Sequence, residues 1–262
     1  ANHYTKRMEV KEYLQKELPL INHTLERELE GLHSSVREVA KYTLSAGGKR
    51  LRPLLTILMA RSLGYHDKNI YPLACALEFL HSATLMHDDI LDNAHLRRGK
   101  KSAHLVFGLT QTVLAGDGLL ALANMIVARY NMPALTHCVA DAILKTATGE
   151  IEEIYWLRKP DLTKDTYLQI IKGKTAYLIQ AACLCGAIIA GADDYIQKQS
   201  RIYGLNLGIA FQLVDDALDY TSTSAVSGKP LGGDLREGKL TLPLILYLKN
   251  LNKEKRKDIL YK

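Results

Sequence analysis

Apolar residues recur at intervals of three and four positions along almost the whole chain, and this helical period most constrains the fold. In the first such stretch, Leu14, Leu18 and Ile21 are separated by charged and polar residues, which is typical of an amphipathic helix. No segment alternates apolar and polar residues over the length of a strand, so no convincing strand is predicted. An all-α chain is expected, with helices over residues 10–30, 51–63, 73–91, 112–130, 140–157, 167–190, 196–219 and 242–251.

No linker rich in glycine, proline or serine divides the chain, and no repeat of a whole domain is visible. The 262 residues are 47% hydrophobic, which allows a sizeable core. Pro19 is expected to break or kink the first helix, because proline lacks a backbone donor. We therefore predict a single helical-bundle domain over residues 1–262.

The most membrane-like stretch is residues 176–192, which holds 17 residues and includes Gln180. A membrane span needs about 20 apolar residues, so we predict a central helix that is buried on all sides. The N-terminus lacks the apolar core of a signal sequence, and the four cysteines form no CxxC pair, as in a reducing compartment. A cytoplasmic protein is expected, or an organellar one if a transit peptide was removed.

Two copies of the pattern DDxxD carry most of the chemical information. The first begins at Asp88 and the second at Asp215, each after a strongly apolar helical segment. Positions i and i+4 share one face of a helix, so Asp88 and Asp92 point the same way. Carboxylates this close need a compensating cation, and ligands that are all oxygen suit Mg2+ bound to phosphates. The alternative is two solvated acidic helix ends.

Basic loops lie beside both acidic motifs. The segment GGKRLRP, residues 47–53, brings three cations to a glycine turn at a helix start, where backbone N–H groups attract anions. Arg97 and Arg98 follow the first DDxxD, and guanidinium forks bind phosphate oxygens. Taken alone, the first could be a solvated basic turn and the second a counter-ion for the aspartates. Together they suggest that two phosphate groups meet here.

Further polar residues accompany the second acidic motif. Lys174 interrupts a buried helix, where an unpaired lysine is costly, and Lys229 and Lys239 flank a Gly-Gly-Asp turn after the motif. His81 lies two helical turns before Asp88 on the same face, although a lone histidine there is more often a core residue. Each lysine alone is more often an ordinary surface residue, but jointly they suggest a phosphate clamp.

The chain resembles the trans-polyprenyl diphosphate synthases in motifs that follow the family's order over residues 46–246. The matching segments are GGKRLRP, LEFLHSATLMHDDILD, LRRGK, AGDGLL, GEIEE, GKTAYLI, LGIAFQLVDDALDYT and GKPLGGDLREGKLTLPLI. The resemblance implies an all-α isoprenoid synthase bundle with a central cavity for diphosphate and Mg2+. It implies a prenyltransferase that joins isopentenyl diphosphate to an allylic diphosphate, with the released diphosphate accepting the proton.

The resemblance also implies a role for each motif residue. Mg2+ would be held by Asp88, Asp92 and Asp215, with supporting or completing contributions from Asp89, Asp216 and Asp219. The allylic substrate would contact Arg97, Lys174, Thr175, Gln212, Lys229 and Lys239. Isopentenyl diphosphate would contact Gly48, Lys49, Arg52, His81 and Arg98. The residues expected to carry catalysis are Asp88, Asp92, Arg97, Lys174, Asp215 and Lys229.

The chain departs from the family pattern in two places. Glu153 stands where the family often carries glutamine, and the chain ends at Lys262, whereas family members usually continue through further C-terminal helices. We therefore expect uncertain local contacts at Glu153 and C-terminal helices that are lacking here.

Product length is expected to depend on residues before the first DDxxD. Thr84 and Ala83 are small, and bulky aromatics at these positions stop growth early in the resembling family. Leu80 could form a deeper floor, or Ala83 could merely pack against a neighbouring helix. A medium or long product of C30–C50 is expected, with C20 as the alternative.

Three other functions fit the sequence less well. A terpene cyclase of the DDxxD type would need neither GGKRLRP nor a second acidic motif. A non-catalytic subunit would usually lose motif residues, although this chain could still need a partner subunit. The net charge of +6 suits an anionic partner, but the basic loops lack interleaved aromatics, so no nucleic acid is expected. A homodimer follows from the resemblance, and a peripheral membrane contact follows from a long product.

Overall fold

The computed structural model describes residues 9–221 and 232–261, in which helices predominate, so the all-α prediction is confirmed. The chain begins with α1 (Val10–Leu29), α2 (Ser34–Ser45), α3 (Leu51–Ser62) and α4 (Ile70–Leu91). A hairpin of β1 (Leu96–Arg97) and β2 (Lys100–Lys101) precedes α5 (Ala103–Phe107), α6 (Leu109–Ala128) and α7 (Pro133–Trp156). The last part holds α8 (Lys164–Ile171), the π-helical segment η1 (Lys172–Ala176), α9 (Tyr177–Ile189), α10 (Asp194–Thr221), α12 (Gly233–Glu237), α13 (Leu242–Lys249) and α14 (Lys253–Tyr261).

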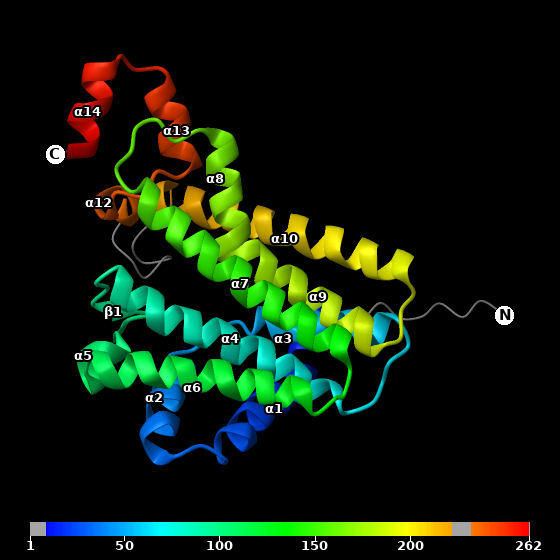
Figure 1. Ribbon diagram of the computed structural model, residues 1–262. Coiled ribbons are helices and arrows are strands. Elements are labelled where there is room, and N and C mark those ends of the chain that lie inside the picture. The colour runs from blue at the N-terminus through cyan, green and yellow to red at the C-terminus, as the bar shows by residue number, and fades with distance from the viewer. Residues whose placement is uncertain (1–8, 222–231, 262) are drawn as a thin grey trace.

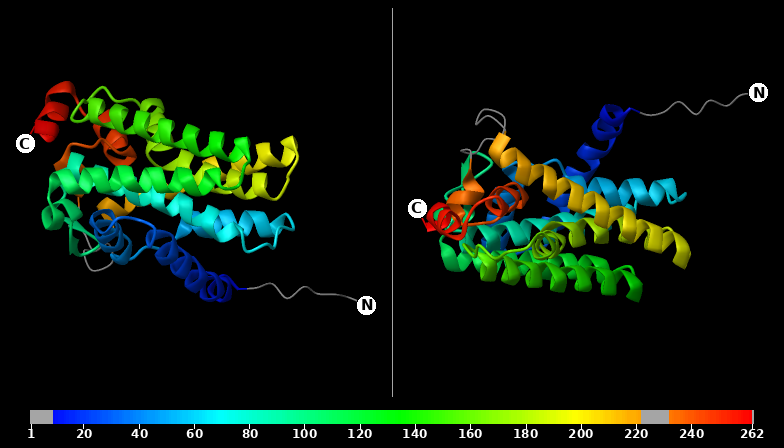
Figure 2. Two further views of the ribbon diagram at one scale, coloured as in Figure 1. Left: turned by 60° about the horizontal axis from the view of Figure 1, so that its bottom comes forward. Right: turned by 90° about the horizontal axis from the view of Figure 1, so that it is seen from above.

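The long helices lie side by side (Figures 1 and 2), and α4 and α9 are largely buried among them. α4 packs against α6, α3 and α1, whereas α9 packs against α10, α3 and α7. The helix α9 is buried on nearly every side, as predicted for its apolar sequence. By length and composition, α6 could cross a membrane, but it packs against α4, α2 and α7.

Two local expectations are wrong. Pro19 lies inside α1, which continues unbroken to Leu29. Proline removes one donor, but burial of Ile21 and Leu25 in the main core holds the following turns in place. The two-residue strands β1 and β2 are too short to produce the alternation from which a strand is predicted.

The ends of α4, α7 and α10 gather at one end of the molecule, together with β1 and α12 (Figure 1). A second apolar cluster lies there and joins α8 to α13 and α14, with Tyr167, Ile171 and Leu240 among its buried members. Leu240 is buried in this cluster. The neighbouring Lys239 is therefore held at the end of the molecule where α4, α7 and α10 end.

Candidate active site

The first acidic motif occupies the C-terminal end of α4. Asp88 is partly buried, and burial together with the carboxylates of Asp92 and Glu153 raises its pKa to about 7, against the opposing effect of Lys174. Asp92 follows the last residue of the helix and accepts a hydrogen bond from Lys239 Nζ at 2.8 Å. The motif therefore presents one carboxyl that holds its proton unusually tightly and one that is already paired.

The hairpin after α4 places the two arginines on different partners. Arg97 forms an ion pair with the buried carboxylate of Asp89, with Nε 3.0 Å from Oδ1. Arg98 donates to the carbonyl of Gly47 in the loop before α3. A Cβ added at Gly48 would lie 2.8 Å from the Arg98 guanidinium, so glycine allows this approach.

The second acidic motif ends α10 and is tied to neighbouring elements. Asp216 is buried and accepts hydrogen bonds from the Tyr167 hydroxyl and, at 2.7 Å, from Gln212. The hydroxyl of Thr175 donates to Gln212 Oε1 at 2.6 Å. These buried hydrogen bonds connect α8, α10 and η1, and they fix the orientation of the face of α10 that carries the motif.

The two other aspartates of this motif differ in their surroundings. Asp215 is exposed. Asp219 accepts backbone N–H groups of Gly233 and Asp234 at 3.2 and 3.1 Å, so it caps the start of α12. Burial and the carboxylates of Asp219 and Asp216 raise the pKa of Asp234 to about 7.

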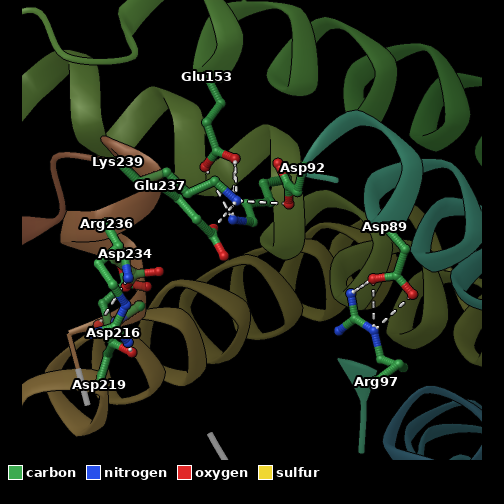
Figure 3. Close-up of polar contacts among 12 residues, drawn as sticks. Asp89, Asp92, Arg97, Glu153, Asp216, Asp219, Asp234, Arg236, Glu237 and Lys239 are labelled. Carbon is green, nitrogen blue, oxygen red and sulfur yellow. Dashed lines mark hydrogen bonds and ion pairs between the residues drawn. The ribbon is translucent and has the colours of Figure 1, made fainter. Parts of the chain in front are cut away.

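Two lysines lie among carboxylates between the acidic motifs, and Figure 3 shows one of them, Lys239, beside Asp92, Glu153 and Glu237. Lys174 Nζ lies 3.0 Å from Glu153 Oε2 on α7. Lys239 Nζ lies 2.8 Å from Asp92, 3.1 Å from Glu237 and 3.5 Å from Glu153. Burial alone would lower the pKa of each lysine, but the surrounding carboxylates reverse the effect and raise both pKa values. Both ammonium groups are therefore charged at neutral pH.

The π-helical segment η1 allows Lys174 to reach this space. Gly149 of α7 and Gly173 of η1 meet so closely that a Cβ on Gly149 would lie 2.6 Å from the Gly173 Cα. A π-helical turn inserts an extra residue into a helix and often marks a functional site. Here it turns Lys174 toward Glu153, and Thr175 toward Gln212.

A separate cluster of basic residues lies where α3, α4 and the hairpin meet. Arg52 is buried, its Nε has no hydrogen-bond partner, and burial lowers its pKa to about 10. Burial also lowers the pKa of His81 well below its ordinary value, and Arg52 and Arg98 lower it further. Arg50 is different, because it pairs with the buried carboxylate of Glu78 at 3.1 Å. Glu78 also favours the charged forms of Arg52 and Arg98, so one negative charge faces three guanidinium groups.

An acid-rich half and a base-rich half thus adjoin on α4. A family model for polyprenyl synthetases matches residues 33–262. The chain belongs to the polyprenyl synthetase family. The resemblance drawn from the motifs is thereby confirmed.

Similar proteins of this family include synthases with long products. The chain is 39% identical to the octaprenyl diphosphate synthase of Escherichia coli over 83% of its own length and 68% of that protein. It is 37% identical to heptaprenyl diphosphate synthase component 2 of Bacillus subtilis, over 91% of this chain and 68% of that one. A decaprenyl diphosphate synthase structure from Rhodobacter capsulatus superposes with a TM-score of 0.87 at 37% identity, over 94% and 76% of the two chains.

The remaining predicted residues of this family member have varied environments. Lys49 is exposed in the loop before α3, and Lys229 lies outside the described residues. Ala83 and Leu80 are buried in the main core, whereas Thr84 is partly exposed and donates to the His81 carbonyl at 2.8 Å.

Several charged residues of the site were not predicted. Glu150 lies one turn before Glu153 on α7, and burial and Asp88 raise its pKa to about 8. Glu237 and Asp234 surround Lys239 from α12, and Tyr167 holds Asp216. In the sequence, the i, i+3 spacing of Glu150 and Glu153 beside a glycine was the signal that could have pointed to these two carboxylates. Nothing in the sequence pattern marked Tyr167.

Proposed function

We propose that this chain condenses isopentenyl diphosphate with an allylic diphosphate to give a longer trans-polyprenyl diphosphate, in a reaction that depends on Mg2+. Membership in the polyprenyl synthetase family supports prenyl transfer. The observation that carries the proposal for this site is the arrangement on α4. His81 lies in the field of several arginines, and Asp88 two turns later lies in the field of carboxylates and of Lys174.

The base-rich half suits the diphosphate of isopentenyl diphosphate. Arg52 and Arg98 would bind its oxygens, since Arg52 is buried with an Nε that has no hydrogen-bond partner and Arg98 lies beside it. His81 is neutral at neutral pH because of its lowered pKa, so it can donate one hydrogen bond from its ring. Gly48 and Lys49 would complete this half from the loop before α3.

The acid-rich half suits Mg2+ in its donor set. Among the described residues, no three His, Cys, Asp or Glu side chains lie grouped as a ready metal site. The oxygens are nevertheless of the right kind. Burial first, and neighbouring carboxylates second, raise the pKa values of Asp88 and Asp234, and a bound cation would favour the ionised form of both. Asp88, Asp92 and Asp215 would hold the ions, and the buried contacts of Asp89, Asp216 and Asp219 would orient the two motifs. Bound Mg2+ would supply positive charge to the diphosphate of the allylic substrate.

The lysines and polar groups between the motifs would receive that allylic diphosphate. Lys174 and Lys239 carry fixed positive charge where negative charge develops as the diphosphate departs. Arg97 would extend this field, Gln212 and Thr175 hold their side of the site through the hydrogen bond between them, and Lys229 is assigned by its motif alone. We assign no side chain as general base, because the departing diphosphate can accept the proton lost in the coupling.

For product length we propose a medium or long chain, C30–C50, with C20 as the alternative. The octaprenyl, heptaprenyl and decaprenyl synthases named above support a long product. Ala83 and Thr84, one turn before Asp88, are both small. Leu80, one turn deeper, would limit the product at a later stage.

A homodimer is proposed from one apolar face. On α6 and α7, Leu114, Met125, Leu144 and Ile151 are each at least 59% exposed, and exposed apolar patches of this kind mark interaction sites. The similarity to a synthase named component 2 supports a heteromeric partner as the alternative. We further propose that residues 1–262 act as one domain in the cytoplasm, with peripheral membrane contact through the long product.

The test is an elongation assay with labelled isopentenyl diphosphate, Mg2+ and allylic primers of increasing length. We expect longer diphosphates from the wild-type chain and a loss of at least about 10²-fold in turnover for Asp88→Ala and Asp215→Ala. Asp161→Ala, at an exposed position of the α7–α8 loop, is the matched control and should retain full activity. Hydrocarbon products formed without isopentenyl diphosphate would instead identify a terpene cyclase.

A further inference from the structure

Glu153 contacts both lysines of the site, and Figure 3 shows its carboxylate beside Lys239. Its carboxylate contacts Lys174 Nζ through both oxygens, at 3.3 and 3.0 Å, and Lys239 Nζ at 3.5 Å. The lysines come from η1 and from the segment after α12, whereas Glu153 belongs to α7. One carboxylate thus joins three separate parts of the fold.

Glu153 is ionised in this position. Burial alone would raise its pKa, but Lys174 and Lys239 together lower it below its ordinary value. The two ammonium groups repel each other, and Lys174 opposes the charged form of Lys239. A shared carboxylate offsets that repulsion while no substrate is present.

Lys239 is surrounded by carboxylates in this arrangement, one of which accepts a hydrogen bond from it. An ammonium group carries three N–H donors, and Lys239 faces the three carboxylates of Asp92, Glu153 and Glu237. A phosphate oxygen that binds Lys239 must therefore compete with these carboxylates for the ammonium group. The contact with Glu153 is the longest of the three, at 3.5 Å, so it is the one that opens at least cost.

This inference rests on the proposed function, because it concerns the same allylic diphosphate. We propose that Glu153 is a positioning residue that competes with the diphosphate for Lys174 and Lys239. The lysines leave Glu153 when a diphosphate binds, and they return to it when the inorganic diphosphate is released. Glu153 therefore weakens the binding of the ground state and of the product, and it shortens the time for which the product diphosphate occupies the site.

Replacement of Glu153 by glutamine isolates the charge. Glutamine keeps the shape and one acceptor oxygen, but it removes the negative charge that competes with phosphate. The lysines would then bind diphosphate more tightly, and release would become slower. Glu153→Asp keeps the charge on a shorter side chain and should remain close to the wild type.

Binding can be measured without any prenyl substrate. Trp156 is the only tryptophan in the chain, and it lines the same cavity as Glu153, Lys174 and Lys239. Its fluorescence, with isothermal titration calorimetry as a second measurement, can follow inorganic diphosphate with and without Mg2+. We expect Glu153→Gln to lower the Kd for inorganic diphosphate by roughly three- to tenfold, as removal of a nearby like charge should.

Two controls accompany this experiment. Glu152→Gln removes the same charge from the adjacent exposed position and should leave the Kd unchanged. Circular dichroism and thermal unfolding show whether each variant is folded, and Glu153→Ala removes the same charge if Glu153→Gln is not folded. An unchanged or higher Kd for folded Glu153→Gln would overturn the proposal.

Turnover provides an independent readout. In Glu153→Gln we expect KM for the allylic diphosphate and kcat to fall together, with a burst of product in the first turnover. A higher KM with unchanged kcat would indicate simple loss of orientation and would contradict competition. Tighter diphosphate binding in a chain that elongates no primer would refute prenyl transfer and leave the role of Glu153 intact.

Discussion

Asp88 and His81 lie on the same helix, yet their surroundings perturb them in opposite senses. Burial and neighbouring carboxylates raise the pKa of Asp88 to about 7, whereas burial and a ring of arginines lower the pKa of His81. Before ligands bind, Asp88 therefore holds its proton more tightly than a free carboxyl group does, and His81 loses its proton more readily than a free imidazole does. The acid-rich half is suited to a metal cation, and the base-rich half is suited to an anionic diphosphate.

The raised acidic pKa values predict a fall in stability at higher pH. Burial and Asp88 raise the pKa of Glu150 to about 8, so the folded state holds this proton more tightly than the unfolded state does. That stabilisation is complete below the unfolded pKa and is lost as pH rises through about 8. His81 acts in the opposite sense, but only near and below its unfolded pKa of about 6.5.

We therefore expect the melting temperature of the metal-free protein to decrease between about pH 6.5 and 8.5. Glu150→Gln should flatten this decrease, because it removes one titrating group. Differential scanning fluorimetry in EDTA would measure both. A melting temperature that rises across this range would contradict the assigned shifts.

Arg52 gives a second prediction at the scale of the residue. Arg52→Met should raise KM for isopentenyl diphosphate by roughly 10- to 100-fold, because a charge-assisted contact to phosphate is lost. The melting temperature should hold or rise, since a buried charge with a lowered pKa is replaced by an apolar side chain.

Steady-state kinetics with each substrate varied in turn would test the Arg52 prediction. Arg201→Met on α10, at an exposed position, is the control. An equal increase in KM for the allylic substrate would argue against a dedicated isopentenyl pocket.

Sequence reasoning reached the two acidic motifs and the basic loops because each is a local pattern with its own chemistry. It did not reach the pairing of Glu153 with lysines 21 and 86 residues later in the chain, since periodicity says which face a residue occupies but not what lies opposite. The contacts of Tyr167 with Asp216 and of Arg50 with Glu78 were missed for the same reason.

Among the elements, η1 has the most influence on the site. The sequence predicted one helix over residues 167–190, and the structure divides it into α8, η1 and α9. Apolar spacing continues through the π-helical turn, so no pattern marks it. Lys174, which seemed too costly for a buried helix, was the sign that the helix is interrupted there.

The crossing of α7 and η1 should be intolerant of any side chain. A Cβ on Gly149 would lie 2.6 Å from the Gly173 Cα and 2.8 Å from the Lys174 nitrogen, and both are backbone atoms that cannot rotate away. Gly149→Ala should therefore cost about 1–3 kcal/mol in the free energy of unfolding and should displace Lys174.

Urea unfolding together with diphosphate binding would check this prediction. Gly31→Ala is the control, because its Cβ would meet only the Glu28 carbonyl at 4.0 Å. A Gly149→Ala protein of unchanged stability would mean that the two helices can separate without loss.

For the whole molecule, the exposed apolar face of α6 and α7 is the feature that the separate chain leaves unexplained. Leu144 and Ile151 are 67% and 68% exposed, two turns apart on α7. Periodicity predicted these helices but not which apolar residues remain outside the core, because both kinds share the same spacing.

Charge placed on this face should separate the proposed dimer. Leu144→Glu combined with Ile151→Glu should give a monomer with helical content unchanged, since neither side chain is buried in the chain. Light scattering after size exclusion would measure the mass, and Leu58→Glu on α3, 47% exposed, is the control. A wild-type chain that is already monomeric would contradict the proposed homodimer.

Because His81 and Asp88 both lie on α4, this helix determines the distance between the two halves of the site. Seven residues of α-helix span about 10 Å and return to nearly the same face, so the two substrates would be held at a separation set by backbone geometry alone. Side-chain exchanges between these residues should alter the room for the hydrocarbon but not this spacing. Insertion of a single residue there would turn the aspartates by about 100° relative to the histidine, and two intact half-sites would no longer face a common reaction.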